Sequence, residues 1–530
     1  MLFMDKYTLR AFGYAAIVTI GGFVFGLDAA VISGTLRYIT LEFGLTDLQV
    51  GTVVSAPALG VLIALVITGA ICDSIGRKKT LLLIAILYIL SAVGSAWATS
   101  YEMLVGARFI GGLAFTSLSL ASMYIGEIAP PAQRGKLVSM NQLMIVLGLT
   151  AAYFSNYWLV GLLESNTAWV IEYNLLQDIW RWMLGVEIIP AVIWALLLLL
   201  VPLSPRWLVA KGRYDEAKVS LAKLMPAEKI DDELAAIIES SQQEHQKPMK
   251  LTEQFQVMFE KRFRLAIMIG VIFAAVQPLT GVNPILFYAP MVFEQTGIGT
   301  NAAFAQTLII GVVSFVFTAL AIVLVDRLGR RPLVNFGLIA SIVCLVLCVT
   351  AFKQASYTLT ADDVVQIETT LDSDVAEQLQ PLVGQTFDSD TGYKNALIAA
   401  IGQDSYKAHE SELIQAAVSI NAMLVLIGIV GFIAAFHVSI GPLMWVVFSE
   451  IVPTQIRGVA IPGFALISSV ISYFMQKFFP WQLANFGAAD IFTSYAVAGL
   501  IGLVLLYRYL PETKNKSIEE VERLLNPQTA

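Results

Sequence analysis

The sequence is poor in charged residues. Only 14% of its 530 residues are charged, whereas 57% are hydrophobic; soluble proteins average about 25% and about 45–50%. A chain this apolar cannot hide its side chains from water in a soluble core, so it needs lipid as its solvent. Apolar runs close to the roughly 20 residues that cross a bilayer recur along the whole length. These features exclude a large soluble domain and predict an integral membrane protein.

Histidine and cysteine are scarce as well. The three histidines are scattered, and the three cysteines (Cys72, Cys344 and Cys348) lie in or beside apolar segments without metal-ligand or disulfide spacing. No nucleophile–base pair or phosphate-binding loop is visible, so we expect neither an enzyme nor a bound metal or cofactor. The net charge of −7 leaves no basic face for nucleic acid. No protein partner is predicted.

Hydropathy predicts twelve membrane spans, six before residue 204 and six after residue 262. The expected spans are 11–33, 49–71, 80–98, 103–125, 136–160, 181–203, 263–290, 301–325, 332–353, 417–448, 458–480 and 487–510. The short polar N-terminus runs directly into the first span without a signal-peptide cleavage pattern, so this helix should be retained.

The distribution of Lys and Arg predicts the orientation. Most of the 33 basic residues, including the Arg77-Lys78-Lys79 cluster, fall in the polar segments that share a side with the N-terminus. Because basic loops stay inside, both termini should be cytoplasmic. The one Asn-x-Ser/Thr sequence, Asn515-Lys-Ser517, then lies on the cytoplasmic side, which fits a bacterial inner membrane.

The longer polar stretches predict the domain organisation. Residues 1–203 should form a first six-helix bundle, and 204–262 a cytoplasmic linker whose apolar spacing fits amphipathic helices. A second bundle should span 263–510. Within it, residues 354–416 form an acidic extracytoplasmic insertion that could cap the external mouth, and residues 511–530 form a cytoplasmic tail.

Two short motifs each occur twice, in the same order. The first begins at Asp73 and again at Asp326, and the second begins at Glu127 and again at Glu450. The first pair is 253 residues apart and the second 323. The extra length therefore lies between Asp326 and Glu450, where the acidic insertion is found. Such a duplication predicts two pseudo-symmetric six-helix bundles.

Each motif places an acid at a helix end and a base a few residues later, at the predicted cytoplasmic boundary. Exposed ion pairs contribute only about 0–1 kcal/mol, which suits a latch that must open. The pairs considered are Asp73–Arg77, Glu127–Arg457 and Glu450–Arg134, which could bridge neighbouring helices or the two halves. The full set expected in the latch is Asp73, Arg77, Glu127, Arg134, Asp326, Arg330, Arg331, Glu450 and Arg457. The alternative is that these charges only follow the positive-inside rule.

In this arrangement the chain resembles the sugar porter family of the major facilitator superfamily. Beside the repeated motifs, the likeness is carried by Gly-Leu-Asp28, Pro202-Leu-Ser-Pro-Arg206, Gln277-Pro-Leu-Thr-Gly-Val-Asn283, Gly441-Pro-Leu-Met-Trp445 and Pro511-Glu-Thr-Lys514. The resemblance covers everything except the acidic insertion. It implies an all-α membrane protein with the major facilitator fold, in which two bundles expose a central site alternately to either side.

The same resemblance implies which residues contact the sugar. The expected contacts are Gln142, Gln277, Asn283 and Trp445, with His437, Ser314 and Phe25 as further pocket residues. An amide offers a donor and an acceptor, as a sugar hydroxyl does. An indole presents a flat apolar face and one N–H. For each buried amide, a hydrogen bond between helices is the structural alternative, and for His437 it is helix packing.

Several amides usual in this family are absent. Pro278 and Leu149 stand where glutamines are common, Ser314 replaces an asparagine, and Phe287 replaces a tyrosine. Leu203 replaces a glutamate of the motif after the sixth span. A site that lacks one hydrogen-bond partner binds a given hydroxyl much more weakly. The sugar is therefore left unnamed, and a polyol or cyclitol remains an alternative substrate.

Two charges fall deep in predicted spans, Asp28 in the first and Arg108 in the fourth, and Glu187 in the sixth could join them. Charges at that depth are costly unless paired and are usually functional. We expect Asp28 to carry the proton of a symport cycle, with Arg108 modulating it. The alternatives are a permanent structural ion pair, a passive facilitator, and a sensor that binds sugar without transport.

Prolines and glycines interrupt two spans. Pro278, Gly281 and Pro284 lie close together in the seventh, and Gly441-Pro442 lies in the tenth. Proline removes a backbone donor, and such breaks are tolerated at membrane depth only where protein or a water-filled cavity meets the freed groups. We expect these two helices to bend as gates; fixed kinks are the alternative.

Overall fold

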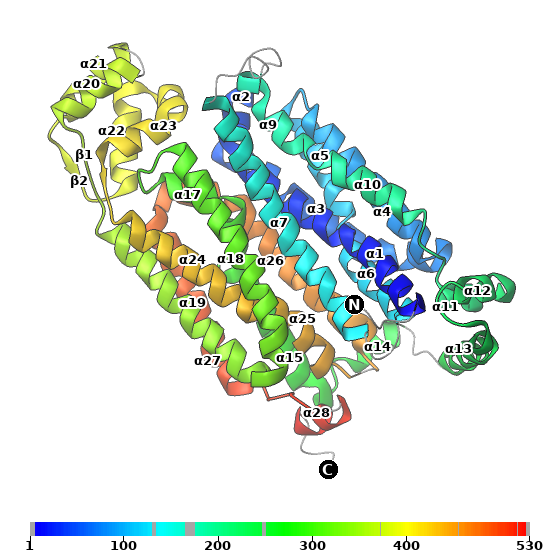
Figure 1. Ribbon diagram of the computed structural model, residues 1–530. Helices are drawn as coiled ribbons and strands as arrows, with labels where there is room; N and C mark the ends of the chain where they lie inside the picture. The colour runs from blue at the N-terminus through cyan, green and yellow to red at the C-terminus, as the bar shows by residue number, and fades with distance from the viewer. Residues whose placement is uncertain are drawn as a thin grey trace.

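A computed structural model describes residues 6–129, 134–164, 175–245, 251–370, 373–453, 455–516 and 518–525. Long helices form two groups that lie side by side, with a smaller unit at one end and short helices at the other (Figure 1). We call these ends the cap end and the linker end.

The helices of the N-terminal half (α1–α10) follow one another along the chain. They are α1 (Lys6–Val31), η1 (Ile32–Gly34), α2 (Leu36–Phe43), α3 (Asp47–Ile75), α4 (Arg77–Ala96), α5 (Tyr101–Leu113), α6 (Ser117–Ile128), α7 (Arg134–Glu164), α9 (Leu175–Gly185) and α10 (Ile188–Leu198).

Short helices connect the halves, and longer ones build the C-terminal half (α15–α27). The connecting helices are α11 (Pro205–Ala210), α12 (Tyr214–Leu221), η3 (Ala227–Lys229), α13 (Ile230–His245), α14 (Leu251–Val257) and η4 (Lys261–Phe263). The C-terminal half contains α15 (Arg264–Leu279), α16 (Val282–Phe287), α17 (Ala289–Glu294), α18 (Thr300–Leu328), α19 (Arg330–Lys353), α24 (Ala422–Val438), α25 (Ile440–Ile451), α26 (Arg457–Phe486) and α27 (Ala488–Tyr509), and α28 (Ile518–Leu525) follows it.

Eleven helical stretches of the described chain are long and apolar enough to cross a membrane. The twelfth expected span, 103–125, is divided between α5 and α6, because the chain leaves the α-helix at residues 114–116. Neither piece is long enough to cross on its own, but together they cover the expected range. Membrane-crossing structure in this protein therefore includes broken helices.

Both proline-interrupted spans are broken. In the seventh, α15 ends at Leu279 and α16 begins at Val282, with Gly281 between them at φ +84°. A Cβ at Gly281 would also collide with the ring of Tyr495, so glycine is required here. In the tenth, the break falls at Ser439, two residues before Gly441-Pro442. Both spans expected to bend are therefore broken in this structure.

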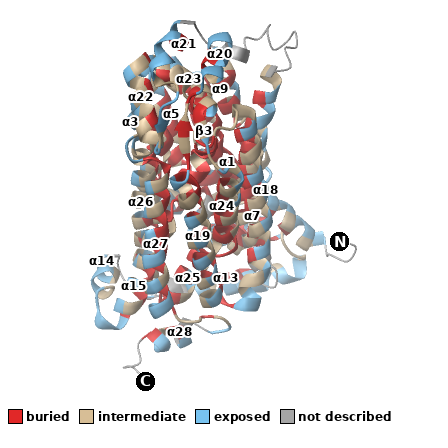
Figure 2. Cartoon of the chain, turned by 90° about the vertical axis from the view of Figure 1, so that its left-hand side faces the viewer, coloured by how far each residue is buried: buried red, intermediate tan, exposed pale blue. Residues whose placement is uncertain are grey.

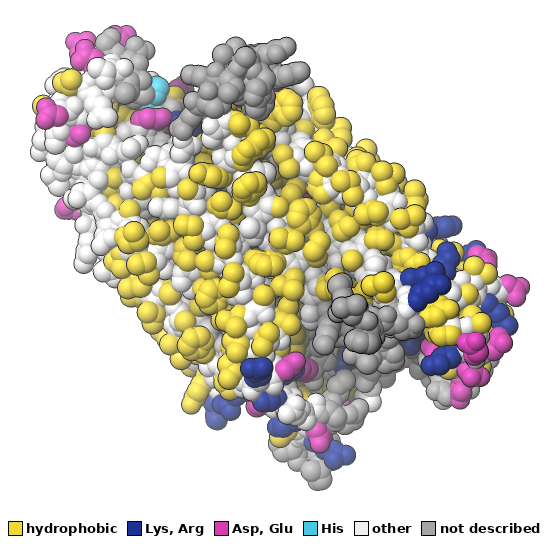
Figure 3. Space-filling model, in the orientation of Figure 1, with side chains coloured by type: hydrophobic (Ala, Val, Ile, Leu, Met, Phe, Trp, Pro, Cys, Tyr) yellow, Lys and Arg dark blue, Asp and Glu magenta, His cyan; other side chains and the backbone are white. Residues whose placement is uncertain are grey.

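Apolar side chains cover the outside of the helical body. Figure 3 shows hydrophobic side chains spread over the middle of this face, with Lys, Arg, Asp and Glu gathered toward its two ends. Many large side chains are exposed, among them Val66, Ile189 and Val504. Figure 2 shows buried residues along the centre of the body and exposed ones on the linker helices. The outer surface thus suits lipid tails, and the polar ends suit water and headgroups.

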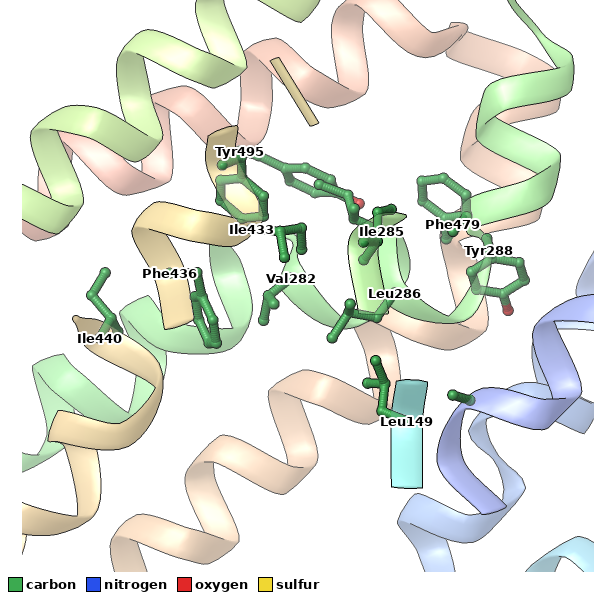
Figure 4. Packing of buried hydrophobic residues seen from close by; sticks show 14 of the residues in the cluster. Leu149, Val282, Ile285, Leu286, Tyr288, Ile433, Phe436, Ile440, Phe479 and Tyr495 are labelled. Carbon is green, nitrogen blue, oxygen red and sulfur yellow. The ribbon is translucent and has the colours of Figure 1, made fainter. Parts of the chain in front are cut away.

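Glycine allows the tightest helix contacts of the N-terminal half. A Cβ at Gly148 of α7 would lie 2.0 Å from the carbonyl oxygen of Phe23 in α1, and one at Gly26 would lie 1.9 Å from the oxygen of Ile145. The two backbones therefore touch across small residues, the usual arrangement for helices packed in membranes. Apolar side chains also meet between the halves: Figure 4 shows Leu149 of α7 next to Leu286 of α16.

The insertion between α19 and α24 is a small unit with its own core. It contains β1 (Ser356–Thr358), α20 (Ala361–Thr370), α21 (Ser373–Leu379), η5 (Gln380–Leu382), β2 (Thr386–Phe387), α22 (Asp390–Ile401), α23 (Gln403–Ala417) and β3 (Val418–Ser419). The strands form an antiparallel sheet in the order β2-β1-β3, with Tyr357 opposite Phe387 and Val418. We call residues 356–419 the cap. The strands are a departure from the all-helical expectation, and residues 418–419, expected to begin the tenth span, belong to this sheet.

We predict that Gly148→Ala destabilises the protein. Its Cβ would meet the backbone of α1 at 2.0 Å, so the two helices must move apart and lose packing. Alanine has a higher helix propensity than glycine, by about 1 kcal/mol. A lower unfolding temperature in this variant must therefore come from the steric clash. Thermal unfolding of purified protein in detergent measures the effect.

Gly161→Ala is the matched control, because Gly161 lies on the same helix and a Cβ there would meet nothing within 4 Å. It should leave the unfolding temperature unchanged or raise it. Equal unfolding temperatures for both variants would show that α1 and α7 tolerate separation, contrary to the packing described.

Candidate functional site

A buried ion pair joins α1 to α5. Asp28 is 4% and Arg108 2% exposed, and Arg108 Nη1 lies 2.5 Å from Asp28 Oδ1. The same nitrogen donates to the backbone oxygen of Asp28 at 3.2 Å. Gly111 and Gly112 let α5 pack closely against α4 and α3. This close packing brings the end of α5 near its neighbours and allows the pair to form. Sequence reasoning named both residues, and the structure brings them together.

Glu187 lies beside this pair, at the break between α9 and α10. It is 2% exposed and interacts electrostatically with both Asp28 and Arg108. One of its oxygens, Oε1, has no hydrogen-bond partner among the described residues. Two carboxyls thus share one guanidinium in an apolar interior. A single cation neutralises only one of them, and an uncompensated buried charge is costly, so this cluster favours holding a proton.

Gln277 and Asn283 lie on opposite sides of the break in the seventh span, and both face α26. Ser468 donates to Gln277 Oε1 at 3.4 Å, and Asn283 Nδ2 donates to Ser472 at 2.8 Å. Ser468 and Ser472 are one turn apart and so share a face of their helix. These bonds use one polar atom of each amide. The pair therefore holds helices together and still presents donor and acceptor groups at the helix break.

The other expected sugar contacts occupy separate helices. Gln142 is half-buried on α7, in the opposite half from Gln277. Trp445 of α25 is 45% exposed and packs edge-on against Phe448 with ring centroids 5.8 Å apart. Phe25 of α1 is half-buried and packs edge-on against Phe115 at 4.9 Å. The structure gives no direct contact that joins these three residues to Gln277 or Asn283.

Ser314 and His437 are buried within the C-terminal half. The Ser314 hydroxyl donates to the carbonyl of Ile310, one turn earlier in α18. His437 of α24 lies 3.1 Å, through Nδ1, from the hydroxyl of Thr318 in α18, and its Nε2 has no partner among the described residues. His437 thus packs between helices and keeps one ring nitrogen available.

The first repeated motif forms a network at the linker end of the N-terminal half. Arg77 Nε donates to Glu127 Oε1 at 3.0 Å, and Arg77 Nη1 lies 3.5 Å from Asp73 Oδ1. The hydroxyl of Ser204 donates to the other oxygen of Glu127. The network therefore ties the start of α4 to the end of α6 and to the chain that follows α10.

The C-terminal half repeats this network with equivalent residues. Arg330 Nη2 donates to Glu450 Oε1 at 2.8 Å, and Arg330 Nη1 lies 3.6 Å from Asp326. Thr513 donates to Glu450 Oε2 at 2.6 Å. In addition, Glu512 accepts the backbone N–H groups of Arg330 and Arg331. Burial raises the pKa of Glu512, but these backbone hydrogen bonds outweigh it and hold the pKa below its usual value.

The ion pairs expected between the two halves need a correction. Glu127 contacts Arg77 instead of Arg457, and Glu450 contacts Arg330 of its own half. Arg457 donates to the backbone oxygens of Ser449 and Val452. The side chain of Arg134 lies outside the described residues. Several basic residues of the sequence could pair with each acid. In this conformation each acid pairs with an arginine of its own half.

Sequence reasoning missed Ser204, Thr513 and Glu512 as members of these networks. A signal was present, because Ser204 and Thr513 both stand two residues after a proline that follows the last helix of a half, in Pro202-Leu-Ser204 and Pro511-Glu-Thr513. Leu203 occupies the place of Glu512 in the first half. It cannot accept hydrogen bonds, so the start of α4 lacks the carboxylate that the start of α19 receives.

Direct polar contacts between the two halves are found toward the cap end. Tyr153 of α7 donates to the oxygen of Leu286 at 2.6 Å, and Thr150 donates to the oxygen of Gly311 at 2.8 Å. Farther toward the cap, Arg37 of α2 donates to Thr300 at 3.0 Å. The described acids of the repeated motifs, at the opposite end, contact only their own half. The halves are therefore held together at the cap end.

This geometry agrees with comparisons to known proteins. The chain is 31% identical over 507 residues to an arabinose-proton symporter of Bacillus subtilis, covering 95% of this chain and 93% of that protein. It is 30% identical to a D-xylose-proton symporter of Escherichia coli, covering 98% and 96%. The inward-open structure of the xylose transporter XylE from E. coli matches with a TM-score of 0.73 at 28% identity, covering 97% of this chain and 99% of that one.

The family profile gives the same assignment. The family described as "Sugar (and other) transporter" matches residues 14–366 and 396–525. The match is interrupted only within the cap, the part of the chain that the resemblance had left out. With the duplicated networks, the broken spans and the buried charges in place, the chain belongs to this family of transporters and has the major facilitator fold.

Proposed function

We propose that this protein imports a sugar by proton symport, with the two halves exposing a central site alternately to each side of a bacterial inner membrane. The linker end and both termini are cytoplasmic in this proposal, and the cap lies outside. The basic residues near the linker end favour that orientation. The relatives named as proton symporters for arabinose and xylose favour a pentose or a similar monosaccharide as the solute.

The observation that carries the proposal is the buried cluster of Asp28, Arg108 and Glu187. A passive facilitator has no need to keep three ionisable groups in an apolar interior, where each is costly. A symporter needs a group whose proton affinity changes between its two conformations. Asp28 is the proposed proton carrier. Movement of α5 relative to α1 would lengthen its contact with Arg108 and change that affinity.

The sugar site is proposed at the break in the seventh span. Gln277 and Asn283 present amide groups there, and Gln142 of the other half and Trp445 are proposed to supply a further amide and an aromatic face. His437, Ser314 and Phe25 are proposed second contacts. Leu149 is buried against Leu286, which leaves an apolar wall where a second amide is usual. A solute with few hydroxyls on that side fits this arrangement better than one with many.

The paired networks of Arg77 with Glu127 and Arg330 with Glu450 are proposed as conformational latches at the cytoplasmic end. Both lie where helices of one half meet, and their side chains are 10–25% exposed, so water still reaches both pairs and weakens the attraction. Contacts of this strength stabilise one conformation without preventing the other.

We predict that Asp28→Asn abolishes sugar-driven proton uptake and leaves exchange of labelled sugar across vesicle membranes. The asparagine has nearly the same shape but cannot carry the proton, whereas exchange requires only the movement of the loaded site. Proton uptake is followed with a pH-sensitive dye in proteoliposomes, and exchange with labelled sugar in the same vesicles.

Asp232→Asn, which removes the same charge from an exposed position of the linker helix α13, should leave both activities near wild type. Thermal unfolding shows whether each variant is folded. If the Asp28 variant still takes up protons with sugar, Asp28 is not the carrier. If the wild type takes up sugar at equal rates with and without a proton gradient, the protein is a passive facilitator.

We predict that Asn283→Ala weakens sugar binding at least tenfold, because a hydroxyl of the sugar loses its amide partner. Ser472→Ala is the matched control, since it removes the same bond between helices but leaves the amide in place. A panel of pentoses, hexoses and polyols is tested for thermal stabilisation of purified protein. Equal losses in both variants, or none in either, would assign Asn283 to helix packing alone.

A further inference from the structure

The cap is fixed to the C-terminal half. It is connected directly to α19 before it and α24 after it. Asp390 at the start of α22 accepts the backbone N–H of Ala488 at 3.0 Å and so caps the first turn of α27. A Cβ at Gly297, in the turn before α18, would touch the side chain of Val418. These attachments predict that the cap moves with the C-terminal half as one body.

The cap is also a stiff unit. Tyr357 of β1 stacks on Tyr393 of α22 with ring centroids 5.4 Å apart, and Tyr393 donates to the oxygen of Leu413 in α23 at 3.0 Å. Around them, buried apolar residues of the strands and helices form a core separate from that of the helical body. A force on α23 is therefore transmitted to the rest of the cap.

From this position α23 reaches across to the N-terminal half. Glu412 Oε1 forms an ion pair with Arg37 Nη2 of α2 at 2.7 Å. Lys407 Nζ donates to the backbone oxygen of Leu45, in the turn before α3, at 2.8 Å. Arg37 also contacts Thr300 at the start of α18, so this one side chain connects the N-terminal half to both the cap and the C-terminal half.

These contacts lie at the mouth of the molecule. Arg37, Lys407, Glu410 and Gln295 line a cavity between the cap and both halves. If the two halves separate at this end, as alternating access requires, the contacts of α23 with α2 and with Leu45 must break, because the cap is held on the other side.

We propose that α23 of the cap is a latch of the outer gate, in which Glu412 and Lys407 hold the N-terminal half against the C-terminal half and release it once in each transport cycle. The proposal rests on the alternating-access function proposed above. It assigns a role to a segment that lies outside the duplicated bundles and to residues that do not touch the central site.

The strength of the contacts suits this role. The side chains of Arg37 and Glu412 are 32% and 39% exposed, so water and salt weaken their attraction. Each contact should shift the ratio of closed to open conformations by about two- to fivefold, as exposed ion pairs do. A fully buried pair in the same place would resist opening much more strongly. The gate is therefore held by contacts that thermal motion can break.

Glu294, at the end of α17, makes the latch sensitive to pH. Burial raises its pKa to about 7, although Arg37 opposes the shift. The charged and titratable groups around it are Arg37 and Tyr38 of α2, Glu410, Glu412 and Lys407 of α23, Lys394 of α22 and Asp47 of α3. When the gate opens, water reaches Glu294 and its pKa returns toward its ordinary value of about 4.3. The closed gate thus binds a proton more tightly than the open gate.

We predict that Glu412→Gln and Lys407→Met each open the outer gate. Spin labels at Leu48 of α3 and Val365 of α20, both exposed, report the distance between the N-terminal half and the cap in full-length protein whose native cysteines are replaced. Each variant should lower the ratio of short to long distances about two- to fivefold. Val365 and Phe486 of α26 both lie on the unit formed by the cap and the C-terminal half. The distance between labels at these two positions should therefore stay the same in every variant.

Asp362→Asn is the matched control, because it removes the same charge as Glu412→Gln from an exposed position of α20. The latch is rejected if both variants give the control's distances, and also if the Val365–Phe486 distance changes while the Leu48–Val365 distance does not. Sugar exchange in the same preparation separates the two proposals. If the label distances change as expected in a protein that exchanges none of the tested sugars, the proposed solute is wrong and the latch proposal stands.

We predict that the short Leu48–Val365 distance becomes more populated as the pH falls through about 7. Protonation of Glu294 favours the closed gate below this pH, and the cost of its buried charge opposes closure as the pH rises above it. Glu294→Gln mimics the protonated form and should stay in the low-pH distribution at every pH. The same pH profile in wild type and variant would remove Glu294 from the gate.

Discussion

Charges inside an apolar protein must be neutralised locally, and this constraint decides much of the architecture. An isolated charge in the interior costs several kcal/mol even after relaxation. Arg108 is therefore found against Asp28, with Glu187 beside them. Because the three groups come from α1, α5 and the break between α9 and α10, neutralisation also fixes how three helices of the N-terminal half are placed. A movement that separates them must replace the lost interaction, with a proton or with water. Because an uncompensated charge in the interior is costly, proton binding and helix movement are coupled.

Near the surface, water screens charges, so an ion pair there costs little energy to form and to break. Arg77 with Glu127 and Arg330 with Glu450 are partly exposed pairs at the linker end, and Arg37 with Glu412 is an exposed pair at the cap end. None can dominate the energy of the molecule. Several such contacts at each end can nevertheless balance one another, so that the two conformations of a transporter stay within a few kcal/mol. Strong interactions thus lie in the interior and weak ones at the two gates.

The sequence predicted those parts of the fold that depend on local pattern. Long apolar runs gave the spans, and the duplicated motifs gave the two bundles. The combination of Pro278, Gly281 and Pro284 located the break in the seventh span, because proline and glycine change the backbone wherever they stand. The break at residues 114–116 was not predicted, since no proline marks it. Asp28 and Arg108 were paired correctly because an apolar interior offers few partners.

Choices among several partners could not be read from the chain. Glu127 has Arg77, Arg134 and Arg457 within the same boundary region, and only the geometry of α4 and α6 selects Arg77. The contacts of Gln277 and Asn283 with Ser468 and Ser472 depend on the rotation of α26, which no local pattern specifies. The small sheet of the cap was missed for a similar reason. Its strands are two or three residues long and pair across about thirty and about sixty residues of sequence, so their hydrophobic pattern carries little information.

The cap breaks the symmetry of an otherwise duplicated molecule, and this asymmetry has a physical consequence. Each half carries a related network at the linker end, and each network joins helices of its own half. At the cap end only the C-terminal half carries an additional unit, which reaches over to the turn before α3 and to α2. Its contacts are made by a carboxylate and an ammonium group that are both partly exposed to water. In the proposed cycle, the balance between the two conformations can therefore respond to conditions at the cap end without any change in the buried cluster of Asp28, Arg108 and Glu187.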